Sequence, residues 1–164
     1  MRTLPSGSDY DAWVALLAVT SRRQQARRHL RTRGPGVVPA LRRGLQHPDP
    51  MVRSSCAGLL DQLMDDASIP DLVAALDDPD IRVVRRALHA LACDGCTQGE
   101  CRPGDDLFVP KAIELLSDPD PDVRAGAIDA LQQVAKRDPS MRERMRELAE
   151  RERHPGLRQA LRGR

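Results

Sequence analysis

At 164 residues with a net charge of +2, the chain has the size of a single domain and is long enough to bury a core. Aromatic residues make up only 2% of it, so the core must be built from Leu, Val, Ile and Ala, and the Leu, Ala and Arg bias favours helices over sheets. No apolar run approaches the roughly 20 residues that span a bilayer, so we expect neither a membrane-spanning protein nor a membrane partner.

The charges are distributed unevenly along the chain. Residues 1–53 hold ten Arg against three Asp, residues 54–122 hold fifteen acids against five bases, and residues 123–164 hold eleven bases against six acids. Such blocks can steer a partner toward one part of the surface. The N-terminal stretch MRTLPSGSDYDAW has no apolar secretory segment, so we expect a soluble protein in the cytoplasm.

The first predicted elements are a helix over residues 10–19 and a second helix over residues 21–32. The second helix carries arginines that form a candidate face for phosphate or another partner: Arg22, Arg23, Arg27, Arg28 and Arg31. The alternative is a solvated cap helix, because the terminal units of stacked-helix proteins need polar outer faces. Stacking aromatics for single-stranded nucleic acid are missing, since Trp13 and Tyr10 are the only aromatic residues nearby.

Three later stretches of the sequence align without gaps. They are VPALRRGLQHPDPMVRSSCAGLL from Val38, IPDLVAALDDPDIRVVRRALHAL from Ile69 and VPKAIELLSDPDPDVRAGAIDAL from Val109. In each stretch a Pro lies six residues before a shared Leu, a Pro-Asp pair follows that Leu after three residues, and a Val follows it after seven. Agreement at so many positions indicates an internal repeat.

Each copy of the repeat predicts a pair of helices. The Pro suits the first turn of a short helix, where its missing N–H costs nothing. Asp49, Asp80 and Asp120 are placed to cap a second helix, along which apolar residues recur at three- and four-residue spacing. Cys56 falls on this apolar stripe, so we expect it to be a small core residue. One pair buries too little surface alone, and the pairs must therefore stack into a solenoid.

The shared pattern, [VI]-P followed by two Leu and then DPDPxVRxxAxxAL, resembles HEAT repeats, in particular the short bacterial HEAT-like repeats also seen in phycobilin lyases. The resemblance covers residues 36–135 well and extends weakly to both ends. It implies an all-α fold, a right-handed α-α superhelix of about five helical pairs that forms one domain over residues 1–164. The repeats are expected at residues 9–33, 36–65, 68–92, 107–137 and 139–162.

An insertion, residues 93–106, separates the third and fourth pairs. The shared Leu recurs after 31 residues from Leu45 to Leu76 but after 40 residues from Leu76 to Leu116, and the excess falls on ACDGCTQGECRPG. A loop lengthened at one place is more often functional than an average loop. The next helix is expected to start near Leu107, with the two preceding Asp residues as its cap.

The insertion and the helix before it supply candidate metal ligands. They are His89, Cys93, Cys96 and Cys101, a three-Cys-one-His set that would close a structural Zn²⁺ site. At about 100° per residue, His89 and Cys93 share one face of their helix and point away from its core stripe. Two alternatives stay open: unligated thiols, or a disulfide or redox dithiol that pairs Cys96 with Cys101 or with Cys93. A cytoplasmic location disfavours a structural disulfide.

The sequence shows no nucleophile, base and orienting group in one place, and no phosphate-binding Gly loop. We therefore expect a non-enzymatic scaffold or adaptor that binds another macromolecule, expected to be a protein, through the concave face of the solenoid, with the Cys-rich loop held by zinc. Two alternatives remain: a nucleic-acid-binding HEAT protein that uses the basic N-terminal helices, and a lyase-like or chaperone subunit that acts on a partner protein.

Overall fold

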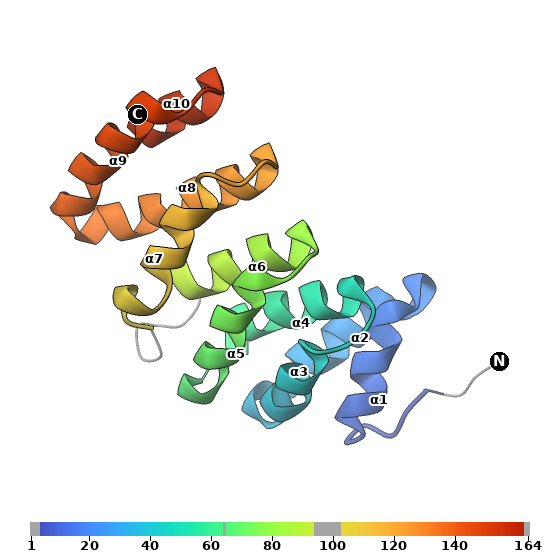
Figure 1. Cartoon of the computed structure of the whole chain (residues 1–164). Coiled ribbons are helices and arrows are strands. Elements are labelled where there is room, and N and C mark those ends of the chain that lie inside the picture. The colour runs from blue at the N-terminus through green and yellow to red at the C-terminus, as the bar shows by residue number, and fades with distance from the viewer. Residues whose placement is uncertain (1–3, 64, 94–102, 163–164) are drawn as a thin grey trace.

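The computed structural model describes residues 4–63, 65–93 and 103–162. Within these residues the chain forms ten α-helices and no strand. The helices are α1 Tyr10–Ala15, α2 Thr20–Arg31, α3 Val38–Gly44, α4 Pro50–Leu63, α5 Ile69–Ala74, α6 Ile81–Ala92, α7 Asp105–Leu115, α8 Pro121–Arg137, α9 Pro139–Arg151 and α10 Pro155–Arg162. Consecutive helices pair, and the five pairs stack in a row with the two termini at opposite ends (Figure 1). The predicted all-α solenoid is confirmed.

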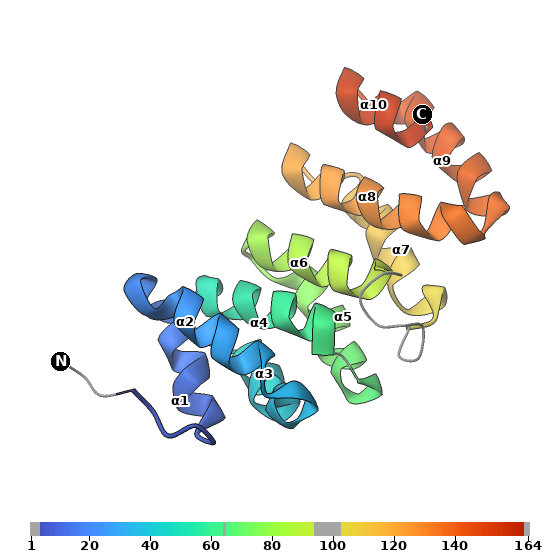
Figure 2. The ribbon, with the colours of Figure 1, turned by 180° about the vertical axis from the view of Figure 1, so that it is seen from behind.

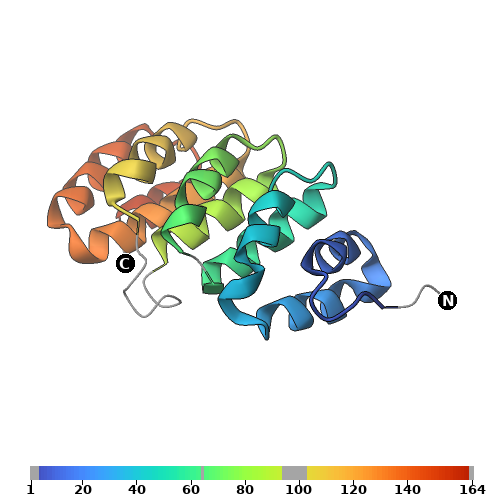
Figure 3. The same ribbon diagram turned by 90° about the horizontal axis from the view of Figure 1, so that it is seen from below.

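The pairs form two layers. The second helices of the first four pairs, α2, α4, α6 and α8, pack against one another in order and lie side by side in one layer (Figure 2). The first helices, α1, α3, α5 and α7, form the other layer (Figures 1 and 3). The layer of second helices also carries the residues that line a surface groove.

The aspartates of the repeat begin the second helices as predicted. Asp49 accepts a hydrogen bond from the Met51 amide at 2.8 Å, and Asp80 accepts one from the Arg82 amide at 3.0 Å. Asp120 caps α8 in the same way. Each carboxylate satisfies one of the amide groups that a helix leaves without a partner at its N-terminus.

Helix α7 differs from the prediction at its start. It begins at Asp105 rather than near Leu107, with Gly104 at the cap position, so Asp105 lies in the first turn and pairs with Arg137 of α8. Pro110 consequently falls inside the helix instead of in its first turn, where it removes one helical hydrogen bond. An acidic first turn favours the longer helix, because negative charge there is stabilised by the helix dipole.

An arginine one turn into a helix binds back to the turn before it, and this explains the Val-Arg step of the repeat. In the third pair Val84 takes this position and is buried. The guanidinium groups donate to backbone oxygens as follows: Arg23 to Leu17 at 2.7 Å, Arg53 to His47 at 2.9 Å, Arg124 to Asp118 at 2.8 Å and Arg158 to Glu152 at 2.9 Å. These arginines therefore stabilise the turn between the two helices of a pair.

Ion pairs connect each helix pair to the next, and three of the five use aspartates of the acidic middle block. Asp78 of the third pair is almost fully buried against Arg53. The ion pairs are Arg43 with Asp11, Arg42 with Asp71, Arg53 with Asp78, Lys111 with Asp77, and Arg124 with Glu152. Each of these acids therefore pairs with a cation of a neighbouring pair, and Asp78 and Glu152 are almost fully buried there.

The core between the layers consists mainly of Leu, Val, Ile and Ala, as the composition requires. Cys56 is fully buried in it, which confirms its predicted role as a small core residue. Phe108 and Trp13 are also buried. Of the helices described, none combines the length and the apolar character needed to cross a membrane.

Candidate functional site

A groove of about 910 Å³ lies over the second helices of the first four pairs. Its charged lining is almost entirely basic: Arg23, Arg27, Arg82, Arg85, Arg86 and Lys136, with Asp129 as the carboxylate among the lining residues. The formal charge of the whole chain is near neutral, so this basic character comes from where the fold places the cations. A groove lined by one sign of charge attracts ligands of the opposite sign.

Two of the groove cations, Arg85 and Arg86, belong to α6 of the third pair. Aligned copies of the repeat place small residues at these two positions, Ser54 and Ser55 in the second pair and Ala125 and Gly126 in the fourth. The long basic side chains of α6 are thus flanked by small residues on α4 and α8, which line the groove beside them.

Two glycines provide the space over which these arginine side chains lie. A Cβ atom on Gly126 of α8 would lie 3.0 Å from Cγ of Arg85, and one on Gly58 of α4 would lie 3.5 Å from Cδ of Arg86. The methylene stems therefore pack against the helix backbones on either side, while both residues remain exposed. This packing holds the stems in place and leaves the guanidinium groups for a ligand.

Arg27 of α2 adds a third cation to the groove. Partial burial and the positive charges of Arg86, Arg31 and Arg23 hold the pKa of Arg27 below its ordinary value. Among the described residues, none of Arg27, Arg85 and Arg86 forms an ion pair with a carboxylate. The groove thus contains mutually repelling cations that an anionic ligand would stabilise.

The arginines predicted from the sequence do not act as one face. Arg23 and Arg27 line the groove. The guanidinium of Arg23, however, donates hydrogen bonds to the backbone oxygens of Leu17 and Ala18, which precede α2. Arg22, Arg28 and Arg31 do not line it, and Arg28 and Arg31 are exposed elsewhere on the helix. Of the five, only Arg23 and Arg27 thus lie in the groove with Arg85 and Arg86 of α6.

The aromatic residues near the N-terminus are engaged in the fold. Trp13 is buried and stacks on His29 with the ring centroids 3.8 Å apart, and its indole N–H donates to the Ser6 oxygen. No Phe, Tyr or Trp is among the residues that line the groove. Base stacking of the kind used for single-stranded nucleic acid therefore has no platform in this groove.

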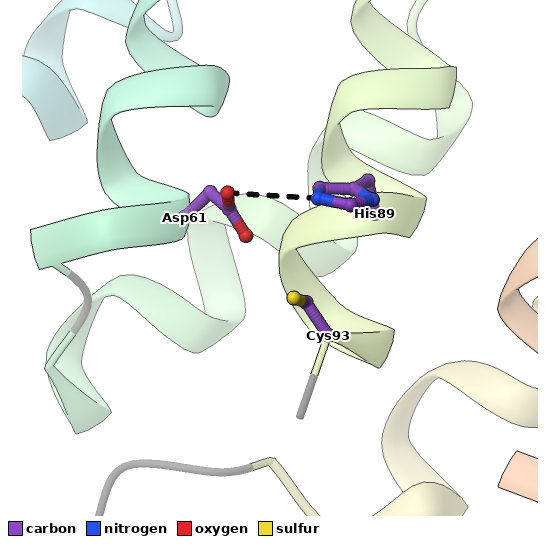
Figure 4. A group of neighbouring side chains, drawn as sticks. All are labelled: Asp61, His89 and Cys93. Atoms are coloured by element: carbon purple, nitrogen blue, oxygen red, sulfur yellow. Dashed lines mark ion pairs between the residues drawn. The ribbon is translucent and has the colours of Figure 1, made fainter. Parts of the chain in front are cut away.

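At one end of the groove, His89 and Cys93 of α6 lie beside Asp61 of α4 (Figure 4). One ligand atom from each residue can be chosen so that all three atoms lie within 4.8 Å of one another. The carboxylate oxygen Oδ2 of Asp61 is 3.6 Å from Nε2 of His89. The structure thus brings together the two helical residues of the predicted metal site and adds a carboxylate to them.

The other two predicted ligands, Cys96 and Cys101, lie outside the described residues. The predicted zinc clip of the loop and the dithiol alternative both depend on them and stay predictions. His89 is exposed and Cys93 is half-buried, in keeping with the outward direction that the helical wheel gave them.

Sequence reasoning missed Asp61 and the pair Arg85 and Arg86, although the repeat carried a signal for both. Aligned copies place Ala92 and Gln132 where the second pair has Asp61. Of these three aligned copies, only the second therefore has a charged residue at this position. Charged residues that replace small or apolar ones in a single copy of a repeat are candidates for function, because the stacking does not require them.

Comparison with known proteins identifies the family. A model described as HEAT repeats matches residues 8–92, and a HEAT-repeat model matches residues 108–137. No curated protein matches the chain.

Among solved structures, the chain is similar to the complex of CpcE and CpcF of phycocyanin lyase from Nostoc sp. PCC7120, with a TM-score of 0.77 and 16% identity over 95% of this chain and 97% of that one. It also resembles human deoxyhypusine hydroxylase in complex with glycerol, with a TM-score of 0.56 and 26% identity over 77% of this chain and 43% of that one. An engineered protein matches with a TM-score of 0.54 and 21% identity over 92% and 75% of the two chains.

The likenesses to the CpcE and CpcF complex and to the engineered protein, at 16% and 21% identity, show the fold alone. The match to the hydroxylase spans less than half of that protein. The family models, in contrast, cover more than half of this chain and coincide with the stacked helix pairs. The chain belongs to the HEAT-repeat family.

Proposed function

We propose that the chain is a non-enzymatic adaptor that binds an acidic segment of a partner protein in the groove over α2, α4, α6 and α8. The observation that carries this proposal is the set of three arginines, Arg27, Arg85 and Arg86, that line the groove and pair with no carboxylate among the described residues. Cations crowded in this way repel one another, so a carboxylate-rich partner gains from pairing with them and relieves their repulsion.

A protein partner is supported by the kind of assembly in which this fold occurs. The similar structure from Nostoc is a complex of two proteins, CpcE and CpcF. Small residues also line the groove, Ser54 and Ser55 on α4 and Gly126 and Ala130 on α8, and an extended or helical segment can pack closely against them. A lyase-like or chaperone role toward the partner would use the same groove and is compatible with the same charge arrangement.

The experiment compares charge reversals on and off the groove. Arg86→Glu and Arg27→Glu place a negative charge in the groove, whereas Arg28→Glu makes the same change one residue away, on the exposed part of α2. A partner captured from native cells by the wild-type chain is identified, purified and titrated by calorimetry against all variants. We expect the Kd to rise at least about tenfold for the two groove variants and to stay at the wild-type value for Arg28→Glu.

The result that contradicts the proposal is equally defined. If Arg86→Glu and Arg27→Glu bind the purified partner as the wild type does, the groove is not the binding surface. If Arg28→Glu weakens binding as much as the groove variants do, the effect comes from net charge and the groove has no special role.

Nucleic acid is a second candidate, because the same unpaired arginines can contact phosphates. The probe is a defined DNA duplex, titrated at several salt concentrations with the wild type and Arg86→Glu. A steep loss of affinity with salt, with a slope reduced in the variant, would favour duplex binding. Absence of salt-dependent binding to the duplex removes this candidate and leaves the protein partner.

A further inference from the structure

We propose that Asp61, His89 and Cys93 form a binding site for a divalent transition-metal ion, with Zn²⁺ as the ion that fits these ligands. Asp61 lies on α4 of the second helix pair, and the other two residues lie on α6 of the third. Figure 4 shows the three side chains directed into the space between these two helices. A metal ion held there connects two neighbouring pairs at the end of the groove.

The spacing of the ligand atoms suits one ion. Bond lengths of about 2.0–2.3 Å to oxygen, nitrogen and sulfur in a tetrahedral shell place the ligand atoms roughly 3.3–3.8 Å apart. Oδ2 of Asp61 and Nε2 of His89 are 3.6 Å apart, and Sγ of Cys93 completes a group whose atoms all lie within 4.8 Å. Small side-chain rotations of Cys93 or His89, which are not fully buried, close the remaining distance.

The state of the Asp61 carboxylate is a second and independent sign of a ligand. Its side chain is only 10% exposed, and its Oδ1 atom has no hydrogen-bond partner among the described residues. A buried carboxylate oxygen without a partner is costly, and buried charges are normally paired or coordinate a metal. Neither Ala92 nor Gln132 offers a charge at the equivalent position, so stacking of the repeats does not require one here.

The same residue types also occur in Cys-His-Asp catalytic sets, but the geometry differs. In those sets the carboxylate accepts a hydrogen bond from one ring nitrogen and thereby orients the imidazole. Here the oxygen-to-nitrogen distance of 3.6 Å is too long for a hydrogen bond. A separation that is too long for a hydrogen bond and close to that of two ligands around one ion favours coordination.

The chemistry of the donors selects the ion. A thiolate, an imidazole and a carboxylate together form a mixed soft and hard set that is typical of Zn²⁺, whereas Mg²⁺ and Ca²⁺ prefer oxygen ligands alone. Three protein ligands leave one position of a tetrahedral shell for water or for a group of a bound partner.

The test uses the full chain without a histidine tag, stripped with a chelator and dialysed. Zn²⁺ binding is measured by calorimetry and elemental analysis, and Co²⁺ is added as a spectroscopic probe that shows a thiolate charge-transfer band and tetrahedral visible bands. We expect one Zn²⁺ per chain and a higher Tm in its presence, because an ion that binds only the folded state stabilises it. In Asp61→Asn the affinity should fall at least about 100-fold.

Two further variants separate this site from the ligand set predicted from the sequence. The double variant Cys96→Ser with Cys101→Ser should keep one Zn²⁺ with an affinity within about threefold of the wild type. Cys93→Ser should lose the cobalt charge-transfer band, and because Cys93 lies at the helix end rather than in the core, this readout stands even if Asp61→Asn fails to fold. His47→Ala, which changes a histidine in the turn before α4, is the matched control and should bind as the wild type does.

Three results would overturn the proposal: no Zn²⁺ bound by the wild type, full affinity in Asp61→Asn, or loss of Zn²⁺ in the Cys96 and Cys101 double variant. The last of these would instead support the ligand set predicted from the sequence. None of these outcomes depends on whether the groove binds an acidic protein.

Discussion

Arg53 of α4 holds Asp78, at the turn before α6, through two hydrogen bonds, from Nε to Oδ2 at 2.6 Å and from Nη2 to Oδ1 at 2.8 Å. The side chains are 13% and 8% exposed. The same guanidinium donates to the backbone oxygens of His47 and Pro48. One side chain thus closes the turn of the second helix pair and connects that pair to the third.

Replacement of Arg53 should therefore destabilise the solenoid strongly. Arg53→Met leaves the Asp78 carboxylate buried without its partner, and we expect the free energy of unfolding to fall by about 3 kcal/mol. Urea denaturation followed by circular dichroism measures this change. Arg43→Met is the matched control, because its ion pair with Asp11 is more than 60% exposed on both sides and should matter much less. Equal losses in the two variants would contradict the assignment.

A close approach of three helices predicts that Gly44 cannot be replaced even by Ala. A Cβ atom at Gly44 would lie 2.5 Å from Sγ of Cys56 and 2.8 Å from Cγ1 of Val14. We expect Gly44→Ala to lower the free energy of unfolding by about 1–3 kcal/mol through overpacking, although Ala is the better helix former. Gly36→Ala, which meets no atom within 4 Å, should be neutral in the same urea titration. Wild-type stability of Gly44→Ala would show that the helices can separate freely.

Cys56 should be chemically inert in the folded protein. Burial raises the pKa of its thiol to about 12, so the reactive thiolate is absent at pH 8. Iodoacetamide should leave Cys56 unmodified in native protein and modify it in urea, as peptide mass spectrometry detects. Rapid modification of Cys56 under native conditions would contradict the buried position.

The same pKa shift sets a dependence of stability on alkaline pH. The folded pKa lies above the ordinary thiol value of about 8.5, so the folded state binds the proton more tightly. Stability is unaffected below a pH of about 8.5, where the thiol is protonated in both states. It falls as the pH rises from there toward the folded pKa of about 12, by at most about 1.4 kcal/mol per pH unit. Cys56→Ala should lack this component, and parallel stability curves for the two proteins between pH 9 and 11 would rule it out.

The candidate site was only partly predictable from the sequence. His89 and Cys93 are four residues apart on one helix, and helical periodicity alone places them on the same face. Asp61 belongs to another helix, 28 residues earlier, and its proximity depends on how α4 packs against α6. Arg27 and Arg86 are likewise brought into one groove by the stacking of three helices, whereas the neighbouring Arg28 falls outside it.

Sequence patterns alone predict the helix pairs, the aspartates that cap them and the stripe that forms the core, because caps and helical periodicity act within a few residues. They place the start of α7 two residues late, since the pairing of Asp105 with Arg137 is a contact between distant parts of the chain. The stacking of the helices sets which charges pair across neighbouring repeats and which remain in the groove. That division depends on the register between stacked helices, and local sequence patterns do not contain it.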